Sequence, residues 1–181
     1  STVVFNGTGS TTLISDAKSF NNLTINDGLV GYWKLDEASA NLCTGGVNDS
    51  CDSSGYGNDG AWSGTNIAAS STVPTLKFSN SRSVVFNGTD DYVSEAAVDL
   101  SGTNKVSVAL WLYQSAFNDT DDLAIEATTN TNNNTTGFFV DPNSSGSCAG
   151  SIAITLKGDV GYSARCYARP SAGAWHHYTA V

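Results

Sequence analysis

The sequence lacks methionine, has three glutamates among its 17 acidic residues, and contains no run of 18 apolar residues. Scarce helix formers disfavour a helical protein, and the missing apolar run excludes a membrane-spanning helix. Only eight basic residues oppose the acidic ones, and the net charge of −9 makes the surface repel phosphate and anionic lipid. We therefore expect no nucleic-acid partner and no membrane span. No charged, apolar leader precedes Ser1, so we expect a mature or excised piece.

The four cysteines form no Cys-x-x-Cys pair and have no histidine nearby, which disfavours zinc and redox sites. An even number of cysteines indicates disulfides. Three pairings are possible, and Cys43 with Cys51 and Cys148 with Cys166 ranks first because it closes the shortest loops. Disulfides predict a secreted or cell-surface protein. Eight Asn-x-Ser/Thr triplets would suit a glycoprotein, although so Asn- and Thr-rich a sequence also produces them by chance. They begin at Asn6, Asn22, Asn48, Asn87, Asn118, Asn133, Asn134 and Asn143.

Short apolar runs separated by turn residues fill the chain, and this pattern predicts an all-β fold, either a sandwich or a barrel. Residues 1–28 read as two or three strands with tight turns, and 29–36 read as a further strand with Trp33 as a core candidate. Residues 105–116 alternate Val106, Val108, Leu110 and Leu112 against Lys105, Ser107, Ala109 and Trp111, as a half-buried strand does. We predict structural roles for four aromatic residues: Trp33, Phe86, Trp111 and Trp175.

Five motifs occur in order between residues 29 and 181: LVGYWKLDEASA, DSSGYGNDGAWSG, RSVVFNGTDDYVSE, KVSVALWLYQ and AGAWHHYTAV. Together they resemble the laminin-G-like domains of the concanavalin A-like lectin and glucanase superfamily. The resemblance covers residues 29–181 and implies a jelly roll of two packed antiparallel sheets. Residues 1–28, read above as strands, would form an N-terminal extension to it. It also implies a non-catalytic module for carbohydrate binding or adhesion on a secreted protein.

Domains of that family continue with further strands after the one that matches WHHYTAV, whereas this sequence ends at Val181. The domain over 29–181 is therefore expected to be C-terminally incomplete. A sandwich without its last strands leaves backbone groups and apolar faces unpaired. We hypothesise that residues 1–28 supply the missing strands, either within the chain or to a neighbouring molecule by strand addition.

The loop DSSGYGNDG, residues 52–60, admits two interpretations. Its glycines let the backbone turn, and Asp52 and Asp59 offer the carboxylate oxygens that calcium prefers. The resemblance supports a structural calcium, because many relatives hold one near this loop. The alternative is a turn in which aspartate side chains accept hydrogen bonds from backbone N–H groups. Asp90 and Asp91 form a second acidic pair, and adjacent like charges either bind a cation or stay solvated; a solvated surface is the simpler interpretation.

Sugar binding needs aromatic rings that stack on pyranose faces and polar side chains that bind hydroxyls, placed on loops above a rigid scaffold. The ligand-binding candidates are Tyr56, Asn58, Trp62, Asp91 and Tyr92, and Tyr113, Phe117, Tyr162 and Tyr167 are further aromatic candidates for stacking on a sugar.

Catalysis by glycoside hydrolysis needs two carboxylates close together. The three glutamates, Glu37, Glu95 and Glu126, are isolated in the sequence, and the adjacent His176 and His177 point to opposite faces of a strand. We therefore expect no enzyme. The first functional hypothesis is a calcium-stabilised module that binds carbohydrate or cell-surface glycans. The second is a structural subunit of a surface filament, which self-associates through exchanged N-terminal strands.

Overall fold

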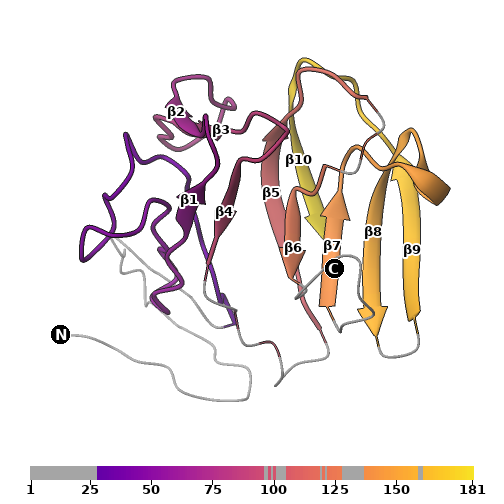
Figure 1. Ribbon diagram of the computed structural model, residues 1–181, viewed down its shortest axis with the longest axis horizontal. Coiled ribbons are helices and arrows are strands. Elements are labelled where there is room, and N and C mark those ends of the chain that lie inside the picture. Colours follow the sequence, from indigo (N-terminus) through magenta and orange to yellow (C-terminus); the bar gives the residue numbers. More distant parts are fainter. Residues whose placement is uncertain are drawn as a thin grey trace, which may run out of the picture.

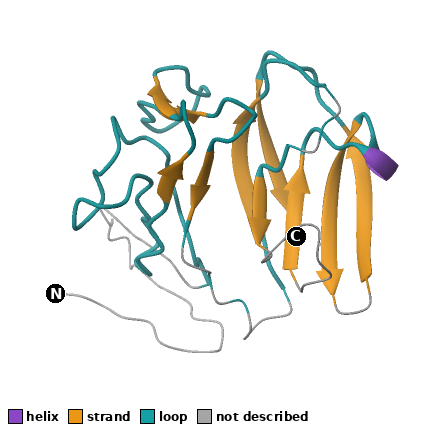
Figure 2. Cartoon of the chain, viewed as in Figure 1, coloured by secondary structure: helices purple, strands orange, loops and turns teal. Residues whose placement is uncertain are grey.

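A computed structural model describes residues 28–95, 98, 100, 105–118, 120, 122–127, 137–158 and 161–181. These residues form β-strands and one short 3₁₀ turn, and they contain no α-helix (Figure 1; Figure 2). The predicted all-β class is therefore confirmed. No helix in this part of the chain is long and apolar enough to span a membrane. All of the proposed N-terminal extension except Gly28 lies outside the described residues, so its strand-exchange role stays a prediction.

The strands pair antiparallel throughout, as a jelly-roll sandwich requires, although the individual sheets are small. The largest sheet has the order β6–β7–β8–β9, and three two-stranded ribbons pair β1 with β4, β2 with β3, and β10 with β5. The elements are β1 (Ala61–Ser63), β2 (Ala68–Ser70), β3 (Ser83–Val85), β4 (Tyr92–Ser94), β5 (Val108–Tyr113), β6 (Ile125–Ala127), β7 (Gly137–Asp141), η1 (Gly146–Cys148), β8 (Ser151–Gly158), β9 (Gly161–Ala168) and β10 (Trp175–Ala180).

Strand β5 confirms the alternation read from the sequence. Val108, Leu110 and Leu112 are partly buried, whereas the intervening side chains are exposed. The structural role predicted for Trp111 is wrong in one respect, because this side chain lies on the exposed face and is 41% accessible. Phe86, which follows β3, is likewise exposed and is no core residue. Alternation separates the two faces of a strand, but it does not say whether a large aromatic on the outer face will be covered.

The best-buried apolar side chains lie in the four-stranded sheet. Phe138 and Val140 on β7 face the same side, and Ile152 and Ala153 on β8 are also buried. In the register of this sheet Val140 pairs with Ile154. In the view of Figure 1 this sheet lies on the right, and the β1–β4 ribbon lies on the left among long loops.

Residues 29–36 do not form the predicted strand; a single bridge joins Trp33 to Asp52. Leu35 adopts a left-handed backbone conformation (φ 55°) that extended strands exclude. The Trp33 ring folds back over Gly31, where a Cβ atom would overlap it. Trp33 is partly buried, in keeping with its predicted structural role, but it packs against a loop rather than within a sheet.

Two disulfides join Cys43 to Cys51 and Cys148 to Cys166, which confirms the connectivity ranked first. The first closes a loop beside the β1–β4 ribbon. The second ties η1 to β9, the edge strand of the four-stranded sheet. Both bridges are compatible with an extracellular location.

Candidate functional site

The loop 52–60 is organised around the Asp52 carboxylate. Its Oδ1 accepts hydrogen bonds from the backbone N–H groups of Tyr32 (2.9 Å) and Ser54 (2.8 Å). Its Oδ2 accepts from the Ser54 hydroxyl (2.7 Å) and the Asn58 N–H (3.0 Å). One side chain thus holds both ends of the loop against the segment before Trp33.

Neighbouring side chains reinforce the same loop. Asp59 Oδ1 accepts the Asp52 N–H at 2.7 Å, and Asn58 Nδ2 donates to the Val30 carbonyl at 2.7 Å. The Trp33 indole Nε1 donates to the Asn58 carbonyl, also at 2.7 Å. Of the predicted ligands in this loop, Asp59 and Asn58 therefore hold the fold together, whereas the Tyr56 side chain is 66% exposed and projects into solvent.

Calcium would have to compete with these donors. Each Asp52 oxygen already accepts two hydrogen bonds, so neither presents a free face to a cation in this conformation. Calcium needs six to eight oxygen ligands. The hydrogen-bonded turn is thus the better fit to the geometry, and calcium binding by Asp52 and Asp59, which would require the donors to move away, stays a prediction.

The electrostatics of this region move the pKa values of two carboxyl groups in opposite directions. Partial burial works to raise the pKa of Asp52, but the hydrogen bonds from Ser54, Tyr32 and Asn58 outweigh it and lower that pKa to about 2. Glu95 directly follows β4. Burial of its carboxyl group, and then the negative charge of Asp52, raise the pKa of Glu95 to about 7, although the residue as a whole is exposed.

These shifts predict how stability depends on pH. The ionised form of Glu95 is disfavoured by folding, so its contribution is fully present below pH 4.5 and is lost as the pH rises through 7. The contribution of Asp52 is present above pH 3.8 and is lost as the pH falls through 2. Replacing Glu95 with Gln should flatten the loss of thermal stability between pH 4.5 and 7 and leave the acid limb unchanged. If the melting temperature of the Glu95→Gln variant falls with pH as steeply as that of the unmodified protein over this range, the raised pKa does not belong to Glu95.

The Asp90–Asp91 pair organises a second loop in the same way. Asp91 Oδ1 accepts the N–H groups of Thr65 and Asn66 at 3.0 Å each, and its Oδ2 accepts the Asn87 N–H at 2.9 Å. Gly64 has φ +120° and lies so close to Asp91 that a side chain there would clash. Asp91 is therefore occupied within the chain. Of the two interpretations of this acidic pair, the structure supports neither a bound cation nor a merely solvated surface.

Trp62 and Tyr92 point to opposite faces of the β1–β4 ribbon. In its register Trp62 pairs with Val93 and Ser63 pairs with Tyr92, and paired residues share a face. Tyr92 is 55% exposed. Trp62 and Tyr92 therefore do not face one ligand from the same side of the ribbon, and of the five predicted ligand-binding residues Trp62 lines the groove described next.

The groove beside Trp62 has a volume of about 760 Å³ and lies between the loop 38–41 and strands β1 and β2. Five of its lining residues are alanines, whose small side chains leave the groove open and shallow. Polar groups come from Ser39, Asn41, Asp49 and Arg82. The full lining is Ala38, Ser39, Ala40, Asn41, Val47, Asp49, Ala61, Trp62, Ile67, Ala68, Ala69 and Arg82.

Asp49 fixes the two sides of the groove to each other. Its Oδ1 accepts the Asn41 N–H at 2.6 Å, and its Oδ2 accepts the Trp62 N–H at 2.5 Å. The Trp62 indole N–H donates to the Ser50 hydroxyl at 2.9 Å, so the orientation of the ring is set from below. Asn41 has φ 62° and an exposed side chain. The groove is thus lined by a pre-oriented indole and by an exposed asparagine, a combination suited to a polar ring-shaped ligand.

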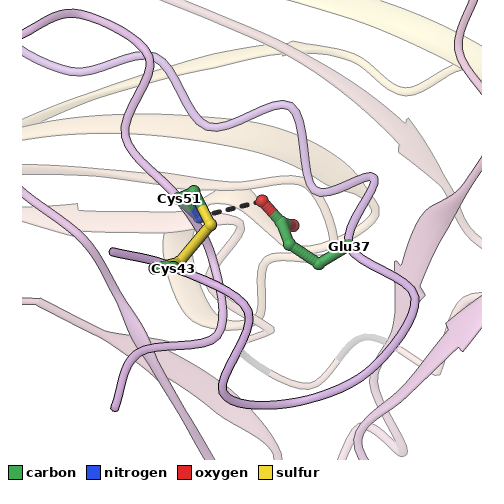
Figure 3. Close-up of side chains that lie close together, drawn as sticks. All are labelled: Glu37, Cys43 and Cys51. Carbon is green, nitrogen blue, oxygen red and sulfur yellow. Dashed lines mark hydrogen bonds between the residues drawn. A yellow bond between two sulfur atoms is a disulfide. The ribbon is translucent and has the colours of Figure 1, made fainter. Parts of the chain in front are cut away.

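Glu37 lies beside the Cys43–Cys51 disulfide (Figure 3). Its Oε1 accepts the Cys51 N–H at 2.9 Å, whereas its buried Oε2 has no hydrogen-bond partner among the described residues. The potential ligand atoms of these three residues lie within 4.8 Å of one another. Both sulfurs belong to the disulfide, so neither is the thiolate that binds metals. The group is thus no metal site while the bridge is intact.

Asn143 is fully buried and belongs to a polar network rather than to a glycosylation site. Its Nδ2 donates to Asn118 and Asp122, and its Oδ1 accepts from Arg169 at 3.1 Å. Arg169 in turn lies over the ring of Phe117, 4.0 Å from its centroid. The Asn143 triplet is therefore inaccessible to glycosylation in the folded domain, and Phe117 is not an exposed platform.

Two pairs of rings meet on the outer face of the β10–β5 ribbon. Trp111 and His177 are cross-strand partners with ring centroids 5.1 Å apart, and Tyr113 and Trp175 are partners at 5.7 Å. The outward position of Trp111 in the alternation of 105–113 is the sequence signal for this face. Tyr162 and Tyr167 on β9 are exposed as expected.

Comparison with protein families identifies a match over the second half of the chain. A family model described as the concanavalin A-like lectin/glucanases superfamily matches residues 87–181, which is slightly more than half of the chain. Comparisons with curated proteins and with solved structures give no match.

Proposed function

The chain belongs to the concanavalin A-like lectin/glucanase superfamily, and on that premise we propose that it is a non-catalytic module that binds carbohydrate through the groove beside Trp62. Members of this superfamily are often carbohydrate-binding or adhesion modules. The observation that carries the proposal is that the Trp62 indole, held by Ser50, and Asn41 line the same open groove.

The chemistry of the groove suits one sugar ring better than an apolar ligand. Trp62 offers a ring face for stacking, while Ser39, Asn41 and Arg82 offer groups that bind hydroxyls. The groove volume of about 760 Å³ is in the range of small-molecule sites. The two disulfides support the further proposal that the module works in a secreted or cell-surface protein.

Replacing Asn41 with Gly should weaken oligosaccharide binding by roughly fivefold or more, the loss of about one hydrogen bond. Glycine tolerates the φ of 62° at this position, so the amide is removed without backbone strain. Glycan-array screening followed by calorimetry on the best ligand measures the effect. The Tyr92→Ala variant is the matched control, because Tyr92 lies on the opposite face of the ribbon.

Replacing Trp62 with Ala should abolish detectable binding, with folding checked by urea denaturation. Equal binding by the Asn41→Gly and Tyr92→Ala variants would place the ligand elsewhere, and release of cleaved oligosaccharide would show an enzyme.

The alternative of a structural filament subunit stays a prediction. Strand β9 supports self-association. It forms an edge of the four-stranded sheet and its side chains are mostly exposed, and an uncovered edge strand can pair with a strand of another chain.

A further inference from the structure

Arg82 stands on the wall of the groove immediately before β3. It makes no ion pair or hydrogen bond with any of the described residues, and it is partly buried. Lys34 lies 3.9 Å from Asp36, and Lys157 lies 5.5 Å from the centroid of the Phe139 ring, whereas Lys77 and Arg165 resemble Arg82 in having no such partner among the described residues. Lys77 and Arg165 are exposed, so Arg82 is the partly buried one of these three cations, and it is the one that lines the groove.

The groove itself provides no anion for Arg82. Its one lining carboxylate, Asp49, is 6% exposed, and both of its oxygens accept backbone N–H groups, from Asn41 and Trp62. The Asp49 carboxylate thus interacts with backbone N–H groups of the protein and holds the two sides of the groove together. Arg82 is the lining residue whose charge remains for a ligand.

A guanidinium group recognises some ligands better than others. Its planar fork matches a carboxylate or sulfate with two parallel hydrogen bonds, which are roughly twice as strong as those between neutral groups. A neutral sugar offers hydroxyls alone and leaves the charge uncompensated when the groove is covered. We propose that the groove binds an acidic glycan, with Arg82 on the carboxylate or sulfate and Trp62 against the sugar ring. This inference rests on the proposed function of the same groove.

Non-specific attraction cannot produce the same preference. The net charge of −9 repels polyanions at long range, up to the distance at which salt screens it. A higher affinity for an acidic sugar must therefore come from short-range contact. Polyglutamate, which carries carboxylates without a sugar ring, should therefore not bind.

An array of matched oligosaccharide pairs tests the proposal. Each uronate is paired with its carboxyl-reduced neutral form, and each sulfated sugar with its desulfated form. The protein should prefer the acidic member of the uronate or of the sulfate pairs by roughly tenfold or more. The Arg82→Gln variant should lose this preference and bind both members of each pair with the same affinity. Arg82→Lys should keep only part of it, because an ammonium lacks the planar fork.

Arg165, exposed on β9 in the four-stranded sheet, provides the control Arg165→Gln, which should bind as the unmodified protein does. Equal binding of both members of every pair overturns the acidic preference and leaves the carbohydrate function intact. A preference that survives in Arg82→Gln overturns the role of this residue. Absence of binding to every pair overturns the proposed function, and this inference with it.

Discussion

Replacing Asp52 with Ala should lower the free energy of unfolding by roughly 2 to 4 kcal/mol. The substitution removes four acceptor contacts at once, to Tyr32, Ser54 and Asn58. The three backbone donors are then left unpaired, and Ser54 is buried, so water cannot readily replace the lost carboxylate at every contact. Urea denaturation at neutral pH, with the slope and midpoint fitted together, measures the change.

Asp36→Ala is the matched control for this experiment. Asp36 is a nearby aspartate whose pairing with Lys34 is a single contact of 3.9 Å between partly exposed groups, and such surface pairs contribute little to stability. We expect a change within about 0.5 kcal/mol. Asp52→Asn should fall between the two, because one amide oxygen remains as an acceptor. Equal effects of Asp36→Ala and Asp52→Ala would show that Asp52 does not organise the loop.

The strand pattern was readable from the sequence wherever alternation was strong. Residues 108–113 form β5 with the expected inner face, because period-two alternation is a property of the strand itself. Residues 29–36 show a similar pattern and form no strand. Leu35 departs from extended geometry, and the backbone N–H of Tyr32 donates to Asp52 instead of to a neighbouring strand. Local pattern could not reveal this competition from a loop that follows in the sequence.

The candidate site was only partly readable. Trp62 was recognisable as an aromatic beside a glycine-rich loop, and it does line the groove. Asn41 and Arg82 carried no signal, because they join Trp62 only through the folding of separate loops around Asp49. The role of Asp52 was undecidable from composition, since a calcium loop and a hydrogen-bonded turn require the same residue types. Only the direction of the N–H groups distinguishes them.

Replacing Cys148 and Cys166 together with Ala should lower the free energy of unfolding by about 3 kcal/mol. The bridge spans 18 residues and ties η1 to the edge strand β9, which among the described strands pairs with β8 only. Without the bridge the unfolded chain regains the entropy of that loop, and an edge strand with mostly exposed side chains has little packing to offset the gain. Thermal and urea denaturation of the variant measure the loss.

The other disulfide provides the comparison, because it closes a loop of only eight residues. The same entropic relation gives about 2.5 kcal/mol for replacing Cys43 and Cys51 with Ala, a smaller loss. If this pair proves the costlier one, the entropy of loop closure is not what chiefly sets the stability that each bridge contributes. Local contacts around each bridge would then set its contribution to stability. One such contact is the hydrogen bond from the Cys51 N–H to Oε1 of Glu37, whose other oxygen, Oε2, has no partner among the described residues. A Glu37→Gln variant in both disulfide backgrounds separates these two contributions, since the amide keeps an acceptor and removes the charge.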